Sequence, residues 1–193
     1  MSSAEEPSQE HRAQSAERAS GTDSAVRGLL LDASGTLLRA APGHFLGVDI
    51  FPDALRLLGE CRRRTLGGVS VRTAVVTNWG HRVIRLLESL GIRDCFDAVV
   101  SADDVHNPKP HAEIFHFACA ELSLPPSACI HLGDSLFDDA LGAQAAGLGA
   151  VWIHRKADPY LSMQERALAA RLTHPSLPNL EEARLFLEEF LAR

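Results

Sequence analysis

The sequence predicts an α/β protein with a doubly wound, Rossmann-like parallel sheet of about five strands and helices on both faces. The first observation behind this prediction is that short apolar runs alternate with longer segments of helical periodicity. The second is that the runs are apolar throughout, which is typical of strands buried on both faces of a parallel sheet. The third is that polar residues follow the runs, at the edge where such sheets bind their ligands.

Five short apolar runs are the expected strands. Because helical segments separate them, successive strands should be parallel and joined by crossover helices. The runs are Val26–Leu31, Val71–Val76, Ala98–Val100, Ala128–Leu132 and Gly149–Ile153.

The segments between and after these runs carry apolar residues every three or four positions, as amphipathic helices do. Gly91 and Gly147 follow two of the segments at positions where glycine commonly ends a helix. Pro125 and Pro126 end another. The expected helices cover about 54–61, 83–90, 111–122, 138–146, 161–172 and 180–191.

The beginning of the chain differs from the rest. Residues 1–25 contain no Leu, Ile or Phe, and such a segment cannot bury enough apolar surface to offset the entropy of ordering. We therefore expect a disordered polar tail over residues 1–25 and one folded domain over residues 26–193. The tail also lacks the apolar stretch of a signal peptide.

Composition excludes several classes of partner. The net charge of −6 and the aromatic content of 6% argue against nucleic-acid binding. No apolar run approaches the ~20 residues of a membrane span, so no membrane partner is expected. The four cysteines are scattered without a C-x-x-C pair, which favours buried, reduced thiols and a cytoplasmic location.

Polar side chains suited to phosphoryl transfer follow the expected strands. They are Asp32, Thr77 with Asn78, Lys109, Asp134 with Ser135, and then Asp138 and Asp139. Each has an ordinary alternative: an Asp after a strand is often a helix cap, and a lone lysine is usually solvated. Their joint placement at one sheet edge favours a single site instead. Such a site would combine a carboxylate nucleophile, a cation site and positive charge for a phosphoryl group.

Four strings of residues extend this pattern to most of the folded chain. They are D-A-S-G-T-L at 32–37, V-T-N at 76–78, N-P-K-P-H-A-E-I-F at 107–115 and G-D-S-L-F-D-D-A-L-G-A-Q-A-A-G at 133–147. In order and content they resemble the four motifs of the haloacid dehalogenase superfamily, and the resemblance covers about Leu29 to Ile153. The resemblance implies a hydrolase core domain, over residues 26–193 of this chain, with phosphatase-type chemistry.

The resemblance also implies catalytic roles for residues of the first three strings. Asp32 would be the nucleophile that becomes an aspartyl-phosphate. Thr77, Asn78 and Lys109 would bind the phosphoryl group, and Lys109 would also steady Asp32.

A magnesium ion is the cofactor that the resemblance implies. Asp32, the backbone carbonyl of Ser34, and Asp134 would be its ligands. Asp139, or else Asp138, would hold the metal ligands in place without binding the ion.

Ser34 is the main departure from the family pattern. Most phosphatases of the superfamily carry a second Asp at this position, which protonates the leaving group. A serine hydroxyl cannot do so near neutral pH, so we expect weak turnover of alkyl phosphates and better turnover of aryl or acyl phosphates. The alternative is a catalytically impaired protein that uses the fold for binding or regulation. Dehalogenation is a more distant alternative, since Asp134 would repel a carboxylate substrate in the absence of Mg²⁺.

The length of the chain gives a second departure. Only about a dozen residues separate Leu38 from Phe51, which is enough for a flap but too short for the cap domain of many relatives. The site should then be open, either to a phosphorylated small molecule or to a bulkier phosphorylated substrate. A neighbouring subunit in a homo-oligomer could also close it. His81 and His111 lie near the expected site. We expect both to be solvated residues at the start of a helix rather than a substitute general acid.

Overall fold

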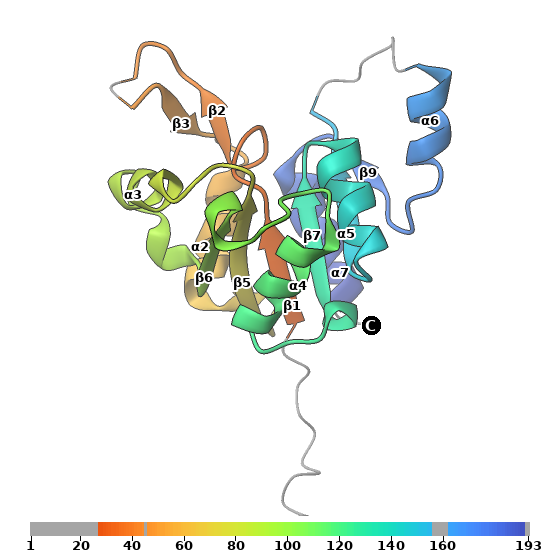
Figure 1. Cartoon of the computed structure of the whole chain (residues 1–193). Helices are drawn as coiled ribbons and strands as arrows, with labels where there is room; N and C mark the ends of the chain where they lie inside the picture. The colour runs from red at the N-terminus through yellow and green to blue at the C-terminus, as the bar shows by residue number, and fades with distance from the viewer. Residues whose placement is uncertain (1–26, 45, 156–161, 192–193) are drawn as a thin grey trace, which may run out of the picture.

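The computed structural model describes residues 27–44, 46–155 and 162–191 (Figure 1). Five parallel strands form the centre of one sheet in the order β6-β5-β1-β7-β8. They are β1 (Arg27–Leu31), β5 (Val69–Thr77), β6 (Ala98–Ser101), β7 (Cys129–Gly133) and β8 (Gly149–Ile153). The predicted fold class is confirmed, and the five runs match these strands to within two residues at either end.

Short strands extend this centre and were missed in the sequence. β9 (Ser176–Leu177) pairs in parallel with β8, and β4 (Thr65–Leu66) pairs antiparallel with β5. β2 (Leu38–Ala40) and β3 (Val48–Ile50) form a separate antiparallel hairpin. Segments of two or three residues are too short to show a periodicity.

Helices cover both faces of the sheet, so each face has its own apolar core. Side chains alternate along a strand: Leu29 and Leu31 face one core, and Leu30 faces the other. The first core includes residues of α2, α3 and α7, and the second includes residues of α4 and α5. The helices are α2 (Ala54–Arg63), α3 (Arg82–Ser89), α4 (Ala112–Glu121), α5 (Gly142–Ala145), α6 (Met163–Ala169) and α7 (Leu180–Leu191).

The helix expected at 138–146 differs in form. It begins two residues earlier as a π-helical turn, Leu136–Leu141, and continues as α5. Ser135 begins this turn: its hydroxyl accepts from Asp138 N, and its carbonyl accepts from Asp139 N at 3.0 Å and Ala140 N at 3.2 Å. The wide first turn directs the Asp139 side chain back toward the end of β7, as its hydrogen bond with Ser135 N shows.

The segment between β1 and α2 is the expected flap. Among the residues described, it consists of the hairpin β2–β3 and its turns. Figure 1 shows this hairpin and α6 on opposite sides of the sheet edge where β1, β5 and β7 end.

Other expectations about the whole chain have mixed outcomes. The expected tail, residues 1–25, lies outside the described residues. All four cysteines are buried and free. No helix in the described ranges is long and apolar enough to cross a membrane.

Candidate active site

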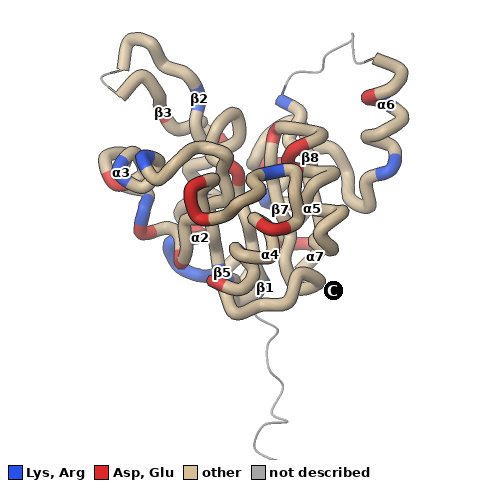
Figure 2. Tube along the Cα trace, viewed as in Figure 1, with Lys and Arg blue, Asp and Glu red and all other residues tan. Residues whose placement is uncertain are grey.

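The carboxyl ends of β1, β5 and β7 surround one pocket, and every residue predicted for the site lines it. The lining residues are Asp32, Ser34, Thr77, Asn78, Trp79, Lys109, Asp134, Ser135, Asp138 and Asp139. Figure 2 shows acidic segments near the ends of β7 and β8, at this side of the sheet. The placement follows from the parallel sheet, because each strand delivers its next residue to the same edge.

Asp32 is the first residue after β1. Its backbone N–H donates to Leu132 O at 2.9 Å, which continues the pairing of β1 with β7. Its side chain is buried, and Oδ1 accepts a hydrogen bond from Lys109 Nζ at 2.6 Å. Burial raises the pKa of this carboxyl to about 7, although the Lys109 ammonium acts in the opposite direction. No described residue donates to Oδ2, so this oxygen remains available for chemistry.

Lys109 is a buried cation between two carboxylates. Its Nζ donates to Asp32 Oδ1 and Asp139 Oδ1, both at 2.6 Å, and to Val76 O at 3.0 Å. Burial alone would lower the pKa of Lys109, but the two carboxylates raise it above its usual value. The side chain is therefore charged and fixed.

Asn78 lines the pocket, and its side-chain amide bonds to the backbone of Lys109. Its Nδ2 donates to Lys109 O at 3.0 Å, and its Oδ1 accepts from Lys109 N at 2.9 Å. Both ends of the amide thus hold the backbone of Lys109. The second Nδ2 proton has no acceptor among the described residues, so binding of the phosphoryl group by Asn78 stays a prediction. Thr77 is buried in the pocket wall, where its hydroxyl accepts from Trp79 N at 3.2 Å and can still donate its own proton.

Asp139, rather than Asp138, contacts Lys109. Its Oδ1 also lies 3.0 Å from His131 Nε2, and its Oδ2 accepts from Ser135 N at 2.9 Å. Burial by itself would raise the pKa of Asp139, but His131 and Lys109 hold it well below its usual range. Asp139 is thus an ionised carboxylate that hydrogen bonds hold in place beside Lys109. Asp138 lines the pocket.

His131 is the main residue of the site that the sequence reading missed. It is fully buried within β7, and its ring meets the Phe115 ring edge to face at 5.2 Å. Burial lowers its pKa, so the ring is neutral and Nε2 donates to the ionised Asp139. The available signal was a histidine in the middle of an otherwise apolar strand, Cys129–Gly133.

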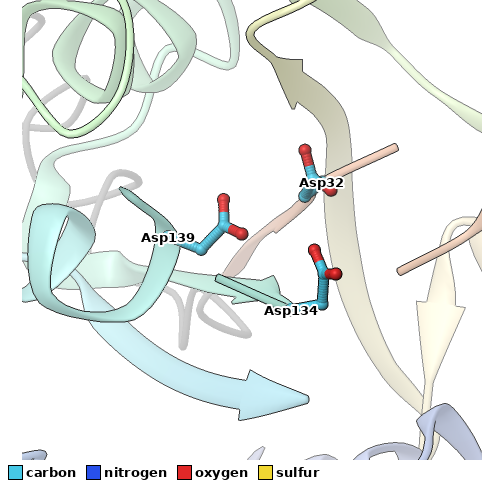
Figure 3. Close-up of side chains that lie close together, drawn as sticks. All are labelled: Asp32, Asp134 and Asp139. Atoms are coloured by element: carbon cyan, nitrogen blue, oxygen red, sulfur yellow. The ribbon is translucent and has the colours of Figure 1, made fainter. Parts of the chain in front are cut away.

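The carboxylates fit a divalent cation. Asp32, Asp134 and Asp139 offer oxygen atoms that all lie within 4.8 Å of one another, and Figure 3 shows the three carboxylates gathered around one space. Both oxygens of Asp139 already accept N–H donors, whereas no other described residue donates to the Asp134 carboxylate. Asp32 and Asp134 are therefore the better ligands, and oxygen donors of this kind suit Mg²⁺.

Ser34 lies at the pocket, whereas His81 and His111 lie outside its lining. Ser34 is exposed and lines the pocket. His81 is exposed and pairs with Asp104 at 2.7 Å, which raises the pKa of its ring. His111 is the N-cap residue of α4. Neither histidine lines the pocket, which agrees with the expected helix-start positions.

A parallel sheet that places a buried aspartate, a hydroxyl, a buried lysine and further aspartates at successive strand ends defines a hydrolase of the haloacid dehalogenase type. The family model for haloacid dehalogenase-like hydrolases matches residues 45–147, just over half of the chain. The chain belongs to this family.

Named relatives agree with this assignment. The mouse haloacid dehalogenase-like hydrolase domain-containing protein 3 is 33% identical over 140 residues, which are 72% of this chain and 53% of that protein. Human N-acylneuraminate-9-phosphatase is 33% identical over 105 residues, 53% of this chain and 40% of that protein. The chain thus spans about half or less of the length of the curated relatives it matches.

A solved structure shares the fold. The phosphatase of this superfamily from Thermococcus onnurineus superposes with a TM-score of 0.70 at 20% identity, over 84% of this chain and 98% of that chain. At this identity the likeness shows the fold alone.

Proposed function

We propose that the protein is a Mg²⁺-dependent phosphohydrolase that acts on a phosphomonoester or acyl phosphate through an aspartyl-phosphate on Asp32, with weak turnover. The observation that carries the proposal is the state of Asp32: one oxygen is held by Lys109 at 2.6 Å, and the other has no donor among the described residues. The resemblance of the chain to a named phosphatase supports the same reaction class.

The proposed reaction has two displacements at phosphorus. Asp32 Oδ2 forms a bond to phosphorus while the bond to the leaving oxygen breaks, and the leaving group departs as an anion unless solvent protonates it. Water then forms a bond to phosphorus, the bond to Asp32 breaks, and inorganic phosphate leaves. The Thr77 hydroxyl would donate to a phosphoryl oxygen in both steps. The Lys109 ammonium, whose three protons go to Asp32, Asp139 and Val76 O, would supply positive charge beside the phosphoryl group.

Mg²⁺, held by Asp32, Asp134 and the Ser34 carbonyl, would supply positive charge to the phosphoryl oxygens. Ser34 offers no acid for the leaving group, so aryl and acyl phosphates should react faster than alkyl phosphates.

The pocket, whose lining includes the exposed Ser34, supports a phosphorylated small molecule or a bulkier phosphorylated substrate. Closure by a second subunit is part of the proposal, whereas nucleic acid and membranes are not. The free, buried cysteines support a cytoplasmic location.

Hydrolysis of acetyl phosphate, p-nitrophenyl phosphate and glycerol phosphate, with Mg²⁺ and with EDTA, tests the proposal. We expect activity in that order, loss with EDTA, and loss in Asp32→Asn. Asp94→Asn is the matched control, since Asp94 is an exposed partner of Arg62 away from the pocket. An Mg²⁺-loaded protein that hydrolyses none of the three and is not stabilised by beryllofluoride would contradict the proposal.

One observation favours the second candidate, a binding or regulatory protein of the same fold. The serine at position 34 offers no general acid, although Thr77 and Lys109, the residues that we propose to act on the phosphoryl group, both line the pocket. Stabilisation by beryllofluoride without hydrolysis of any of the three substrates would favour this candidate.

A further inference from the structure

Arg155 joins four residues with one side chain. It lies two residues after the end of β8, and its side chain is only 18% exposed. Its Nε donates to Gly35 O at 3.0 Å, and its Nη2 donates to Thr36 O at 2.6 Å. Its Nη1 donates to Asp53 Oδ2 at 2.6 Å, and the guanidinium carbon lies 3.7 Å from the centre of the Phe51 ring.

These four partners are the two ends of the β2–β3 hairpin. Gly35 and Thr36 precede β2, whereas Phe51 and Asp53 follow β3. Asp53 Oδ2 also accepts from Leu180 N at 2.8 Å, which fixes it to the start of α7. The planar guanidinium, stacked on an aromatic ring and donating along its edge, thus holds the base of the hairpin to the body of the protein.

The turn held by Arg155 lies directly against the proposed metal pocket. Gly35 has a φ of +77°, and a Cβ atom there would lie 2.0 Å from Asp134 Oδ2. Ser34, the preceding residue, is the one whose carbonyl is proposed to bind Mg²⁺. The position of this turn therefore sets the distance between the Ser34 carbonyl and the Asp134 carboxylate.

The end of β8 also holds the other side of the pocket. Trp152, within β8, donates from Nε1 to Asp134 O at 2.9 Å. Trp152 thus fixes the backbone of Asp134, and Arg155 fixes the turn that faces it. Two residues in β8 and just after it, neither of them a proposed ligand, thus bond to the backbone on both sides of the pocket.

We propose that Arg155 is a positioning residue for the divalent cation: it holds the Ser34–Thr36 turn at the distance from Asp134 that the ion requires. The inference rests on the proposed function, because it assumes that this pocket binds Mg²⁺.

The charge of Arg155 and its hydrogen bonds have opposite effects on the affinity for Mg²⁺. The direction in which the affinity changes in a variant therefore tests the proposal. A guanidinium near the pocket repels a cation, so loss of its charge alone would tighten Mg²⁺ binding. Loss of its hydrogen bonds would release the turn and weaken Mg²⁺ binding. Residues that orient metal ligands typically contribute about 10–100-fold to metal affinity.

The experiment is calorimetric titration of the metal-free full chain with Mg²⁺, at a temperature well below the melting point of every variant. We expect Arg155→Met to raise the dissociation constant by about 10–100-fold. Arg155→Lys keeps the charge but lacks the planar fork, so it should also bind Mg²⁺ more weakly than the wild type. It serves as the second variant if Arg155→Met does not fold.

Arg184→Met is the matched control. Arg184 is similarly buried, at 10% exposure, and pairs with Glu60, Glu181 and Glu188 between α2 and α7. This variant should melt at a lower temperature with an unchanged dissociation constant for Mg²⁺, which separates general destabilisation from an effect on the metal pocket.

Unchanged or tighter binding in Arg155→Met, with Mg²⁺ bound normally by the wild type, would overturn the positioning role and leave the proposed function intact. A wild-type protein that binds no Mg²⁺ would instead overturn the proposed metal dependence and this inference together.

Discussion

At the scale of single residues, Lys109 shows how burial determines the contribution of an ion pair to the free energy of unfolding. Lys109 and Asp32 are joined at 2.6 Å with side-chain exposures of 3% and 7%. Lys109→Met would leave two carboxylates facing each other in a buried space. We expect a loss of about 3–5 kcal/mol in the free energy of unfolding, measured by urea denaturation.

The control for Lys109 is a pair of similar length at the surface. Arg62 and Asp94 are joined at 2.8 Å, but their side chains are 52% and 66% exposed. Arg62→Met should change the free energy of unfolding very little. Equal losses in the two variants would show that Lys109 does not stabilise the two buried carboxylates.

Ser34 is the residue that we expect to limit turnover. Ser34→Asp would place a carboxyl group in the pocket beside the leaving group, where it can act as a general acid. We expect about 10²–10⁴-fold faster hydrolysis of glycerol phosphate and a smaller gain with p-nitrophenyl phosphate, whose leaving group needs no proton. Ser34→Asn, of similar size but without an acid, should show no gain. If both variants hydrolyse glycerol phosphate at the same rate, the missing acid is not the cause of weak turnover.

The residues of the site were largely predictable, but their contacts were not. Asp32, Thr77, Lys109 and Asp134 could be found because each lies at the end of a strand or in the loop after it, and parallel strands end at one edge. The use of the Asn78 amide on the Lys109 backbone depends on two loops meeting, which no local pattern encodes. The same is true of Arg155, whose partners lie more than a hundred positions away.

At the scale of elements, two glycines near the β2–β3 hairpin separate the cost of a left-handed backbone from the cost of a steric clash with the site. Gly35 precedes β2, and Gly47 lies in the turn before β3. Gly35 and Gly47 both have positive φ, +77° and +70°, but a Cβ at Gly47 would meet nothing within 4 Å. Gly47→Ala should therefore cost only the left-handed backbone, about 1–2 kcal/mol. Gly35→Ala should cost more, because the new methyl group also overlaps the Asp134 carboxylate.

Two measurements check this pair of variants. Urea denaturation gives the free energy of unfolding, and calorimetric titration gives the affinity for Mg²⁺. We expect weaker Mg²⁺ binding in Gly35→Ala and unchanged binding in Gly47→Ala. Equal Mg²⁺ affinity in the two variants would contradict the contact between the turn and the Asp134 carboxylate.

The five long strands were predicted to within two residues, whereas the strands of two or three residues were missed. β8 and α7 have the predicted bounds, because their apolar residues bury a complete face. The π-helical turn Leu136–Leu141 could not be predicted, since it depends on Asp139 reaching Ser135 N and Lys109. The periodicity over 138–146 predicted an ordinary α-helix, which is correct only for its second half.

At the scale of the whole molecule, metal binding, protonation and folding are linked. In the protein without metal, burial raises the pKa of Asp32 from 3.8 to about 7. The folded state therefore holds a proton on Asp32 more tightly than the unfolded state does. This contribution favours folding below about pH 4 and declines as pH rises toward 7. A bound divalent cation would favour the ionised carboxylate and so displace the proton.

The linkage predicts that Mg²⁺ stabilises the protein more at about pH 8 than at about pH 5.5. At the lower pH the ion must first displace a proton from Asp32, whereas at the higher pH the carboxylate is already ionised. The measurement is the shift in melting temperature between saturating Mg²⁺ and EDTA at the two pH values. In Asp32→Asn the shift should be smaller and should depend much less on pH, because the amide neither titrates nor carries charge. A shift of equal size at both pH values in the wild type would mean that Asp32 is already ionised at pH 5.5 in the protein without metal, and would contradict the raised pKa.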